Sequence, residues 1–441
     1  MKIQYLSFVL FLAIVITSGC RNADNSPYFA VNLDGKWGYA NVSGEYVVEP
    51  QYDKAGQFSE GYASISVNDE YGYIDETGKI VINPQFEYAD SFKEGLAAIK
   101  LNDSYGFINK DGQIVIEPQF DAALYFEEGL ARIGIGEKIY GYWYSNLKYG
   151  YIDKKGNIVI EPKYDVTWGF KDGIAFVQPN MSELDEDCGY EQDDGEFIIP
   201  LGGKCGYIDT SGKYVIDLKY HHIGNFIDGI ATVELKGKHG YIDKTGKIVI
   251  GLQFEDAMPF EEEGLARIKL GKKYGYINKT GKIVINPQFD NATSFKEGLA
   301  CVKLDDRYGY INKSGEIIIT PQFDNAEPFN DGLARIVLNG KSGFINTKGK
   351  IVINPQFDDA TSFEDGVACV AVSKMCGFIN TKGDYITPPQ FDYDYHWSMP
   401  KFQDGFSIVG LGGKYGVIDK TGHYILNPIY DEIKFAKPKQ K

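Results

Sequence analysis

The chain has 441 residues, of which 43% are hydrophobic, 14% are aromatic and 24% are charged. This aromatic content disfavours intrinsic disorder, because the chain can bury enough apolar surface to fold. The 45 basic and 61 acidic side chains give a net charge of -16, which disfavours nucleic acid as a partner, because binding a polyanion needs clustered positive charge.

Residues 1–19 have the layout of a signal peptide. Lys2 supplies a charge near the start, an apolar run extends from Leu6 to Ile16, and small residues precede Cys20. This run is too short to span a membrane. The ending Ser18-Gly19-Cys20 resembles a bacterial lipoprotein signal, in which the chain is cut before a cysteine that carries lipid.

This resemblance implies that Cys20 is the lipid anchor and that residues 20–30 form the anchor and a polar tether. It also implies that the membrane is a partner and that the protein is held at the cell envelope, on the bacterial outer membrane or the cell surface. A plain secretory signal with an incidental cysteine is the alternative.

One glycine-centred phrase recurs along the rest of the chain. It is clearest at residues 274–285, and Pro-Gln-Phe at 287–289 and Phe-Lys-Glu-Gly-Leu-Ala at 295–300 follow it. Neighbouring copies lie 34 or 35 residues apart except at three places, where the spacing is 44, 56 and 39 residues. The equivalent glycines are Gly38, Gly72, Gly106, Gly150, Gly206, Gly240, Gly275, Gly309, Gly343, Gly377 and Gly416. We divide this region into repeats 1–4 at 31–179, an acidic insertion at 180–204, and repeats 5–11 at 205–437.

Each repeat reads as β-strands, because its apolar stretches are short, rich in Ile, Val, Tyr and Phe, and bounded by turn residues. In one repeat we expect three strands, at 299–304, 308–311 and 316–319, with Pro-Gln-Phe at 321–323 ending the unit. Both faces of the middle strand are largely apolar, so each repeat needs a neighbour on both sides. A glycine at the centre of a strand marks a close approach, and we expect an aromatic ring from an adjacent strand or copy over it.

These features predict an all-β protein, a tandem array of about eleven three-stranded meander repeats that forms an open solenoid or superhelix. A closed ring like a β-propeller is the alternative. Eleven units are many for one ring, and the uneven spacings argue against strict rotational symmetry.

The phrase Lys36-Trp37-Gly38-Tyr39 and its ten relatives resemble the bacterial WG-repeat family. The resemblance covers about residues 31–437. It implies a repetitive β architecture, often exported or exposed at the cell surface, and it transfers no reaction and no catalytic residues to this chain.

The sequence indicates no catalytic residues, no metal site and no cofactor. It contains no nucleophile elbow, zinc-ligand spacing or phosphate-binding loop, and eleven equivalent repeats offer no singular pair of carboxylates. His221 and His222 are adjacent, so strand alternation sends them to opposite faces. In the acidic insertion a calcium-loop pattern fails, because Tyr190 stands where that loop needs glycine.

Two insertions fall at the same hairpin tip of consecutive repeats, at 134–147 and 178–203, and should project from one edge. The first carries the aromatic residues of a candidate binding edge for a glycan or a basic peptide, Tyr140, Tyr142, Trp143 and Tyr144. Purely ornamental loops are the alternative. Cys188 and Cys205 flank the second insertion and form a candidate disulfide. A third insertion, at 393–400, lies in a crossover.

The combined prediction is an exported, lipid-anchored, non-catalytic binding scaffold with an unknown protein or glycan ligand. A glycan-binding or glycan-processing surface protein is one alternative, and a structural spacer of the envelope is another.

Overall fold

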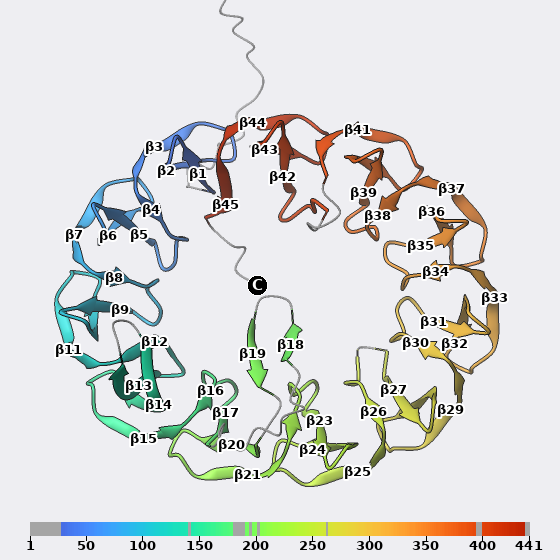
Figure 1. Cartoon of the computed structure of the whole chain (residues 1–441), viewed down its shortest axis with the longest axis horizontal. Helices are drawn as coiled ribbons and strands as arrows, with labels where there is room; N and C mark the ends of the chain where they lie inside the picture. The colour runs from blue at the N-terminus through green and yellow to red at the C-terminus, as the bar shows by residue number, and fades with distance from the viewer. Residues whose placement is uncertain are drawn as a thin grey trace, which may run out of the picture.

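Eleven small antiparallel β-sheets stand around a ring like the blades of a propeller (Figure 1). The computed structural model describes residues 28–139, 143–179, 190–193, 196–200, 203–261, 263–393 and 399–436. The regular elements within these ranges are all β-strands, which confirms the predicted all-β class. The same ranges contain no helix with the length and apolar character that a membrane span requires.

Each blade is a meander whose strands follow one another from the inside of the ring outward (Figure 1). The innermost strands are mostly two residues long: β4 (Lys54–Ala55), β8 (Tyr88–Ala89), β12 (Ala122–Glu127), β16 (Val166–Thr167), β22 (His222–Ile223), β26 (Asp256–Ala257), β30 (Asn291–Ala292), β34 (Asn325–Ala326), β38 (Asp359–Ala360) and β45 (Glu432–Phe435). The second strands are β1 (Phe29–Leu33), β5 (Tyr62–Val67), β9 (Leu96–Leu101), β13 (Leu130–Ile139), β17 (Ile174–Gln178), β23 (Ile230–Leu235), β27 (Leu265–Leu270), β31 (Leu299–Leu304), β35 (Leu333–Leu338), β39 (Val367–Val372) and β42 (Phe406–Leu411).

The third strands carry the repeated glycine: β2 (Lys36–Ala40), β6 (Glu70–Asp75), β10 (Ser104–Asn109), β14 (Trp143–Asp153), β20 (Cys205–Asp209), β24 (Lys238–Asp243), β28 (Lys273–Asn278), β32 (Arg307–Asn312), β36 (Lys341–Asn346), β40 (Met375–Asn380) and β43 (Lys414–Asp419). The outermost strands are β3 (Tyr46–Tyr52), β7 (Ile80–Phe86), β11 (Ile114–Phe120), β15 (Ile158–Tyr164), β21 (Tyr214–Tyr220), β25 (Ile248–Phe254), β29 (Ile283–Phe289), β33 (Ile317–Phe323), β37 (Ile351–Phe357), β41 (Tyr385–Asp392) and β44 (Tyr424–Tyr430). A separate hairpin of β18 (Tyr190–Asp193) and β19 (Glu196–Pro200) belongs to the insertion between β17 and β20.

The two ends of the repeat region meet in one blade. Strand β45, from the C-terminal end, pairs antiparallel with β1, and Val31 lies opposite Ile433. This blade therefore combines β45 with β1, β2 and β3 and closes the ring (Figure 1). The expected open solenoid or superhelix is wrong, and the closed propeller-like alternative is confirmed. The unequal repeat lengths do not prevent closure, because the insertions lengthen hairpins and links while the blades keep their common form.

The predicted three-stranded repeat is incomplete in two respects. A short fourth strand lines the inside of ten blades, and Pro-Gln-Phe lies within the outermost strand instead of ending the unit. In β33 the pairing partners jump from Phe323 to Ile319 while the partners in β32 advance by only two residues. The residues around Pro321 therefore form a bulge of two extra residues in the outer strand.

This bulge explains the repeated glycine. A Cβ atom on Gly309 would lie 2.4 Å from the carbonyl oxygen of Ile319 and 2.6 Å from the nitrogen of Pro321. The close approach is made by the backbone of the neighbouring strand, so the expectation of an aromatic ring over the glycine is wrong. Because backbone atoms cannot rotate away as a side chain can, only glycine fits this position.

We expect Gly309→Ala to destabilise the protein by roughly 1–3 kcal/mol, because the added methyl group forces the bulged backbone to move. Gly251 in β25 is the matched control, since an added Cβ there meets nothing within 4 Å. Denaturant unfolding of both variants tests this explanation, and equal stability of the two would contradict it.

Adjacent blades pack through one recurring aromatic contact. Tyr276 of β28 lies with its ring centroid 4.8 Å from that of Phe295 in the next blade, and its hydroxyl donates to the carbonyl of Thr293 at 2.7 Å. Five other tyrosines donate across a blade boundary in the same way: Tyr39, Tyr73, Tyr151, Tyr241 and Tyr310. Where phenylalanine replaces tyrosine, as in the pair Phe344 and Phe363, the ring contact remains at 4.7 Å. At ten of the eleven blade boundaries a buried ring therefore fixes one blade to the next, whereas in the last blade Val417 of β43 stands in the position of the ring.

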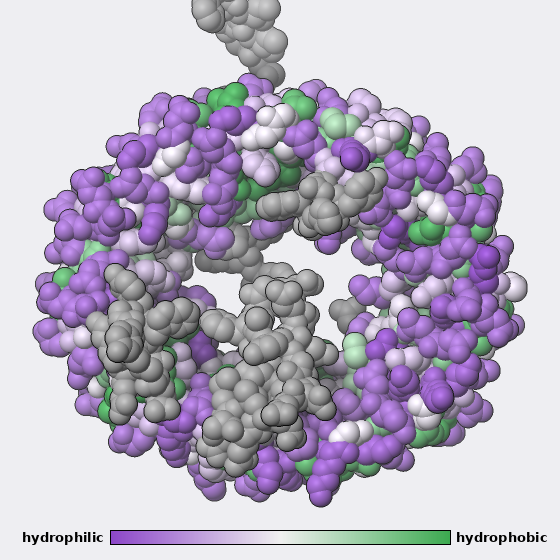
Figure 2. Space-filling model, viewed as in Figure 1, coloured by the Kyte–Doolittle hydropathy of each residue, from purple (hydrophilic) through white to green (hydrophobic). Residues whose placement is uncertain are grey.

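The outer wall of the ring is partly apolar. The first two residues of most outermost strands are exposed aliphatic side chains, such as Ile317 and Ile318, which are 47% and 42% exposed. Hydrophilic residues cover most of the face seen in Figure 2, and hydrophobic residues show there as scattered patches.

Candidate functional site

The predicted aromatic edge lies on a lengthened hairpin. Strands β13 and β14 continue beyond the usual hairpin length, and their last pair joins Ile139 and Trp143. Trp143 and Tyr144 thus occupy the start of β14, and their side chains are not described. Tyr140 and Tyr142 lie outside the described residues, as do the anchor Cys20 and the tether to residue 27. The aromatic edge and the anchor stay predictions.

Cys205, one half of the predicted disulfide, is buried in β20 with 1% exposure. Its thiol donates to the carbonyl of Tyr220 at 3.3 Å, and burial raises its pKa to about 12. Cys188 lies outside the described residues, so the disulfide stays a prediction. Cys301 has a similar environment, since burial raises its pKa also to about 12.

We expect Cys205 and Cys301 to resist iodoacetamide at pH 8 in the folded protein, because raising the pKa from 9.0 to about 12 lowers the fraction of reactive thiolate by about a thousandfold. Peptide mass mapping of native and guanidinium-unfolded samples measures this protection. Rapid labelling of either residue in the native protein would contradict the described burial. Omitting the reductant tests the disulfide, because a linked Cys188–Cys205 peptide would then be recovered.

A cavity of about 350 Å³ opens across three consecutive blades. These are the blades of β34–β37, β38–β41 and β42–β44. Its lining combines charged groups with an apolar wall: Glu327, Asn330, Arg335, Asp359, Ala360, Thr361, Ser362, Phe363, Glu364, Val367, Cys369, Phe378, Met399, Pro400, Lys401 and Phe402. Cys369 contributes to its size, because it stands where the preceding blade has Arg335.

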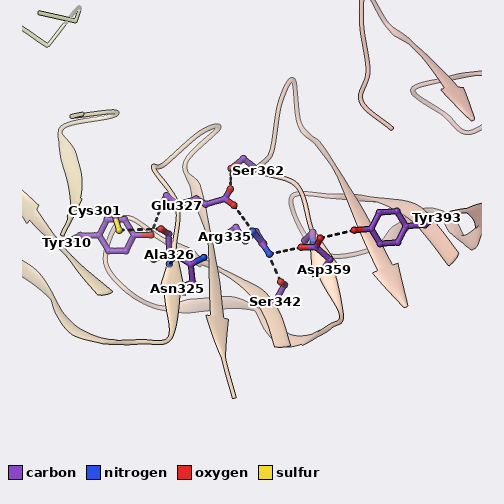
Figure 3. A network of polar contacts seen from close by, with 11 residues as sticks. Cys301, Tyr310, Asn325, Ala326, Glu327, Arg335, Ser342, Asp359, Ser362 and Tyr393 are labelled. Carbon is purple, nitrogen blue, oxygen red and sulfur yellow. Dashed lines mark hydrogen bonds and ion pairs between the residues drawn. The ribbon is translucent and has the colours of Figure 1, made fainter. Parts of the chain in front are cut away.

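Arg335 is the centre of a polar network in this cavity (Figure 3). It projects from β35, and its side chain is only 16% exposed. Its guanidinium lies 2.5 Å from Glu327 Oε1 and 2.6 Å from Asp359 Oδ1, and its Nε donates to the Ser342 hydroxyl at 3.2 Å. We call Glu327, Arg335 and Asp359 the carboxylate–arginine triad. It spans two blades, because Asp359 belongs to β38 of the next one.

Both carboxylates also accept hydrogen bonds from hydroxyl groups (Figure 3). Ser362 donates to Glu327 Oε2 at 2.6 Å, and Tyr393 donates to Asp359 Oδ2 at 2.9 Å. The backbone of Glu327 is held in turn by Tyr310 of the preceding blade, whose hydroxyl donates to the Glu327 carbonyl at 2.7 Å. The triad is therefore fixed before any ligand arrives.

The pairing of Glu327 with Arg335 occurs in one copy of the repeat, although arginine also occupies the second position at Arg132 and Arg267. In the neighbouring blades the positions of Glu327 and Arg335 are threonine and cysteine. There the threonine hydroxyl accepts the backbone N–H of the cysteine, as between Thr361 and Cys369 at 3.0 Å. The predicted sites did not include this paired exchange of Thr and Cys for Glu and Arg, because it differs from the pattern that the copies share. Comparison of the copies at both positions together could have found it.

The arrangement of polar and apolar groups in the cavity suits the binding of a ligand. The triad presents oriented carboxylate oxygens beside the rings of Phe363 and Phe402, which form part of the apolar wall. Within the described ranges, no group of three or more His, Cys, Asp or Glu side chains is arranged to hold a metal ion. His221 pairs with Glu234 through Nδ1 at 3.3 Å.

A family model described as "WG containing repeat" matches eleven stretches of the chain. The matched residues are 37–71, 71–104, 105–138, 149–180, 206–238, 240–274, 274–308, 308–341, 343–374, 377–415 and 415–437. Each stretch begins in the third strand of one blade and runs into the next blade, and together the stretches cover most of the chain. No curated protein matches the sequence.

Several solved structures share a general likeness to the ring. A structure described as the eukaryotic initiation factor is 10% identical, with 94% of this chain and 99% of that chain covered and a TM-score of 0.43. The computationally designed Ika8 protein is 11% identical over 68% of this chain and 96% of its own, with a TM-score of 0.28. The extracellular domain of a one-component system from B. thetaiotaomicron is 10% identical, with coverages of 89% and 74% and a TM-score of 0.29.

Proposed function

The chain belongs to the WG-repeat family, and from that premise we propose that it is a non-catalytic binding scaffold whose ring holds a ligand in the cavity around Arg335. The carboxylate–arginine triad is the observation that carries this proposal. It occupies a cavity of a size usual for small-ligand sites, and the pairing of Glu327 with Arg335 occurs in no other copy of the repeat.

Rigidity supports binding as the role of this site. Each triad group already has partners within the protein, so a ligand meets preformed acceptors and little side-chain freedom is lost on binding. The inter-blade rings hold the three contributing blades in fixed positions. A closed ring is thus a stable frame in which a single junction between blades can carry a ligand-binding site.

We place this scaffold at the cell envelope, anchored through Cys20. The support is the lipoprotein-like ending at residues 18–20 and the short polar tether that separates it from the first strand. Fractionation of cells that express Cys20→Ser tests the anchor. The variant chain should be released from membranes into the soluble fraction, and unchanged membrane retention would overturn the anchoring proposal.

The binding proposal is tested with the soluble chain from Ala23 onward, which is presented to a glycan array and used in pull-downs from cell-envelope extracts. Retention of a sugar or a protein that is weakened by Glu327→Gln supports a binding scaffold acting through the cavity. If a Tyr142→Ala, Trp143→Ala double variant loses retention, the binding site is instead the predicted aromatic edge. Release of a shortened glycan would favour a glycan-processing enzyme, and no retention at all would favour a structural spacer.

A further inference from the structure

The charge balance of the cavity excludes one class of ligand. The guanidinium of Arg335 is shared between two carboxylates, and its Nε is bonded to Ser342, so its positive charge is already compensated. The triad as a whole carries one net negative charge. The exposed Glu364 and Lys401 at the same cavity cancel each other. An anionic ligand would therefore be repelled, and the net charge of -16 on the chain acts in the same direction.

The donors and acceptors of the triad distinguish between the remaining classes of ligand. The hydroxyl hydrogens of Ser362 and Tyr393 are donated to the carboxylates, so these donors are used within the protein. Each carboxylate oxygen has two lone pairs, and several remain available at Glu327 and at Asp359 Oδ2. The triad thus offers acceptors and few donors. A sugar hydroxyl needs both, whereas a primary ammonium group has three donors and no acceptor.

The apolar wall completes the match. Phe402 is half-buried and Met399 is 8% exposed, and these two side chains offer apolar surface to the cavity. Such a wall contacts the methylene groups of an alkyl chain whose charged end reaches the carboxylates, as lysine side chains do elsewhere in proteins. Charge-assisted bonds from an ammonium to carboxylates are among the stronger polar contacts.

We propose that the cavity between these three blades binds an alkylammonium group, either the end of a lysine side chain of a partner or a free primary amine. This inference rests on the proposed binding function and names the chemistry of its ligand. Glu327 and Asp359 receive the ammonium group, Arg335 holds them in position, and Met399 and Phe402 contact the alkyl stem.

Calorimetric titration of the soluble chain tests this with Nα-acetyl-lysine methylamide, with cadaverine as the free amine, and with the Nε-acetylated lysine derivative as the uncharged control. The lysine derivative should bind, and acetylation of its amine should abolish the heat. The lysine derivative binding better than cadaverine points to a peptide source, and the reverse order to a small amine. Binding should weaken as NaCl is raised, because the attraction is electrostatic.

Substitutions of the two carboxylates test whether the amine binds at the triad. Glu327→Gln and Asp359→Asn should each weaken binding of the lysine derivative by about tenfold or more, because each removes half of the carboxylate pair. Asp256→Asn is the matched control, since Asp256 pairs with Arg267 at 3.3 Å in a blade outside the cavity. Thermal melts of all three variants check that the ring remains folded. Each of the two cavity variants is a separate test of the proposed amine site.

Several outcomes would overturn the inference. These are equal binding of the acetylated derivative, equal loss with Asp256→Asn, or affinity unaffected by either cavity variant. Glucose binding that depends on Glu327 would assign the cavity to a neutral sugar. If no amine binds but the soluble chain still retains a ligand from extracts, the alkylammonium inference fails while the binding scaffold stands; if nothing binds in either experiment, both fail.

Discussion

Replacement of Ile433 by aspartate is expected to open the ring and to destabilise the protein by about 4 kcal/mol or more. Ile433 is 6% exposed and lies opposite Val31 in the pairing of β45 with β1. Its side chain belongs to the apolar cluster that includes Phe29 and Tyr430. A carboxylate at this position would be buried without a cation, and the contact it weakens is the one that joins the two ends of the ring.

Thermal melting and small-angle scattering measure the two parts of this expectation. The variant should melt at a lower temperature and show a larger radius of gyration, because the first and last blades can separate. Glu432→Gln is the control on the same strand, since Glu432 is exposed. If Ile433→Asp melted like the wild type and kept its radius, the β1–β45 pairing would not be what closes the ring.

Acid is expected to destabilise the ring steeply below about pH 4. Thirteen carboxyl groups of the described residues have pKa values below their ordinary ones: Asp53, Glu60, Asp75, Asp153, Asp172, Asp209, Asp243, Glu255, Glu263, Asp290, Asp358, Asp419 and Asp431. Many lie at blade junctions. Asp358 is typical, because a hydrogen bond from Lys341 is the main cause that lowers its pKa, and the N–H of Ser373 assists.

Proton linkage explains why stability falls as the pH is lowered. A carboxyl whose pKa is lower in the folded state than in the unfolded chain stabilises the fold above its unfolded value, which is 3.8 for aspartate and 4.5 for glutamate. That stability is lost as the pH falls through the folded values. Asp90 and Glu127 have the opposite effect on the pH dependence of stability, because burial raises their pKa values. These two carboxyl groups are outnumbered by the thirteen whose pKa values are lowered.

Thermal melts between pH 7 and pH 3 should therefore show a fall in Tm, most of it below pH 4.5. Asp358→Asn separates the contribution of one junction. Its Tm should lie below that of the wild type at pH 7 and approach it at pH 3, where the wild-type carboxyl becomes protonated. A gap that stays constant over this range would show that the ion pair with Lys341 contributes no pH dependence.

The strands of each blade could be predicted because their signals are local. In β31 the structure has the predicted range of 299–304, and in β32 it adds one residue at each end of the predicted 308–311. Alternating apolar residues and the turn glycines act over a few positions, so the sequence shows them directly. The innermost strand was missed because two residues, such as Asn291 and Ala292, are too few for any pattern.

The site could not be predicted in the same way. Glu327, Arg335 and Asp359 lie far apart for a sequence motif, and each becomes significant only because adjacent blades face one another. The tyrosines and Trp143 of the first insertion drew attention because they are conspicuous in sequence. A partly buried ion-pair network whose members come from two consecutive repeats gives a weaker sequence signal, although its residues are present in the printed sequence.

The amino-acid sequence by itself determined the repeated unit, its number of copies and its strand character, since these depend on side-chain alternation and turn residues within about 34 positions. Only the tertiary structure decided that the array closes, because closure depends on how β1 and β45 meet from opposite ends of the chain. It also decided where a cavity exists, because the angle between blades determines which unlike residues of neighbouring repeats are brought into contact.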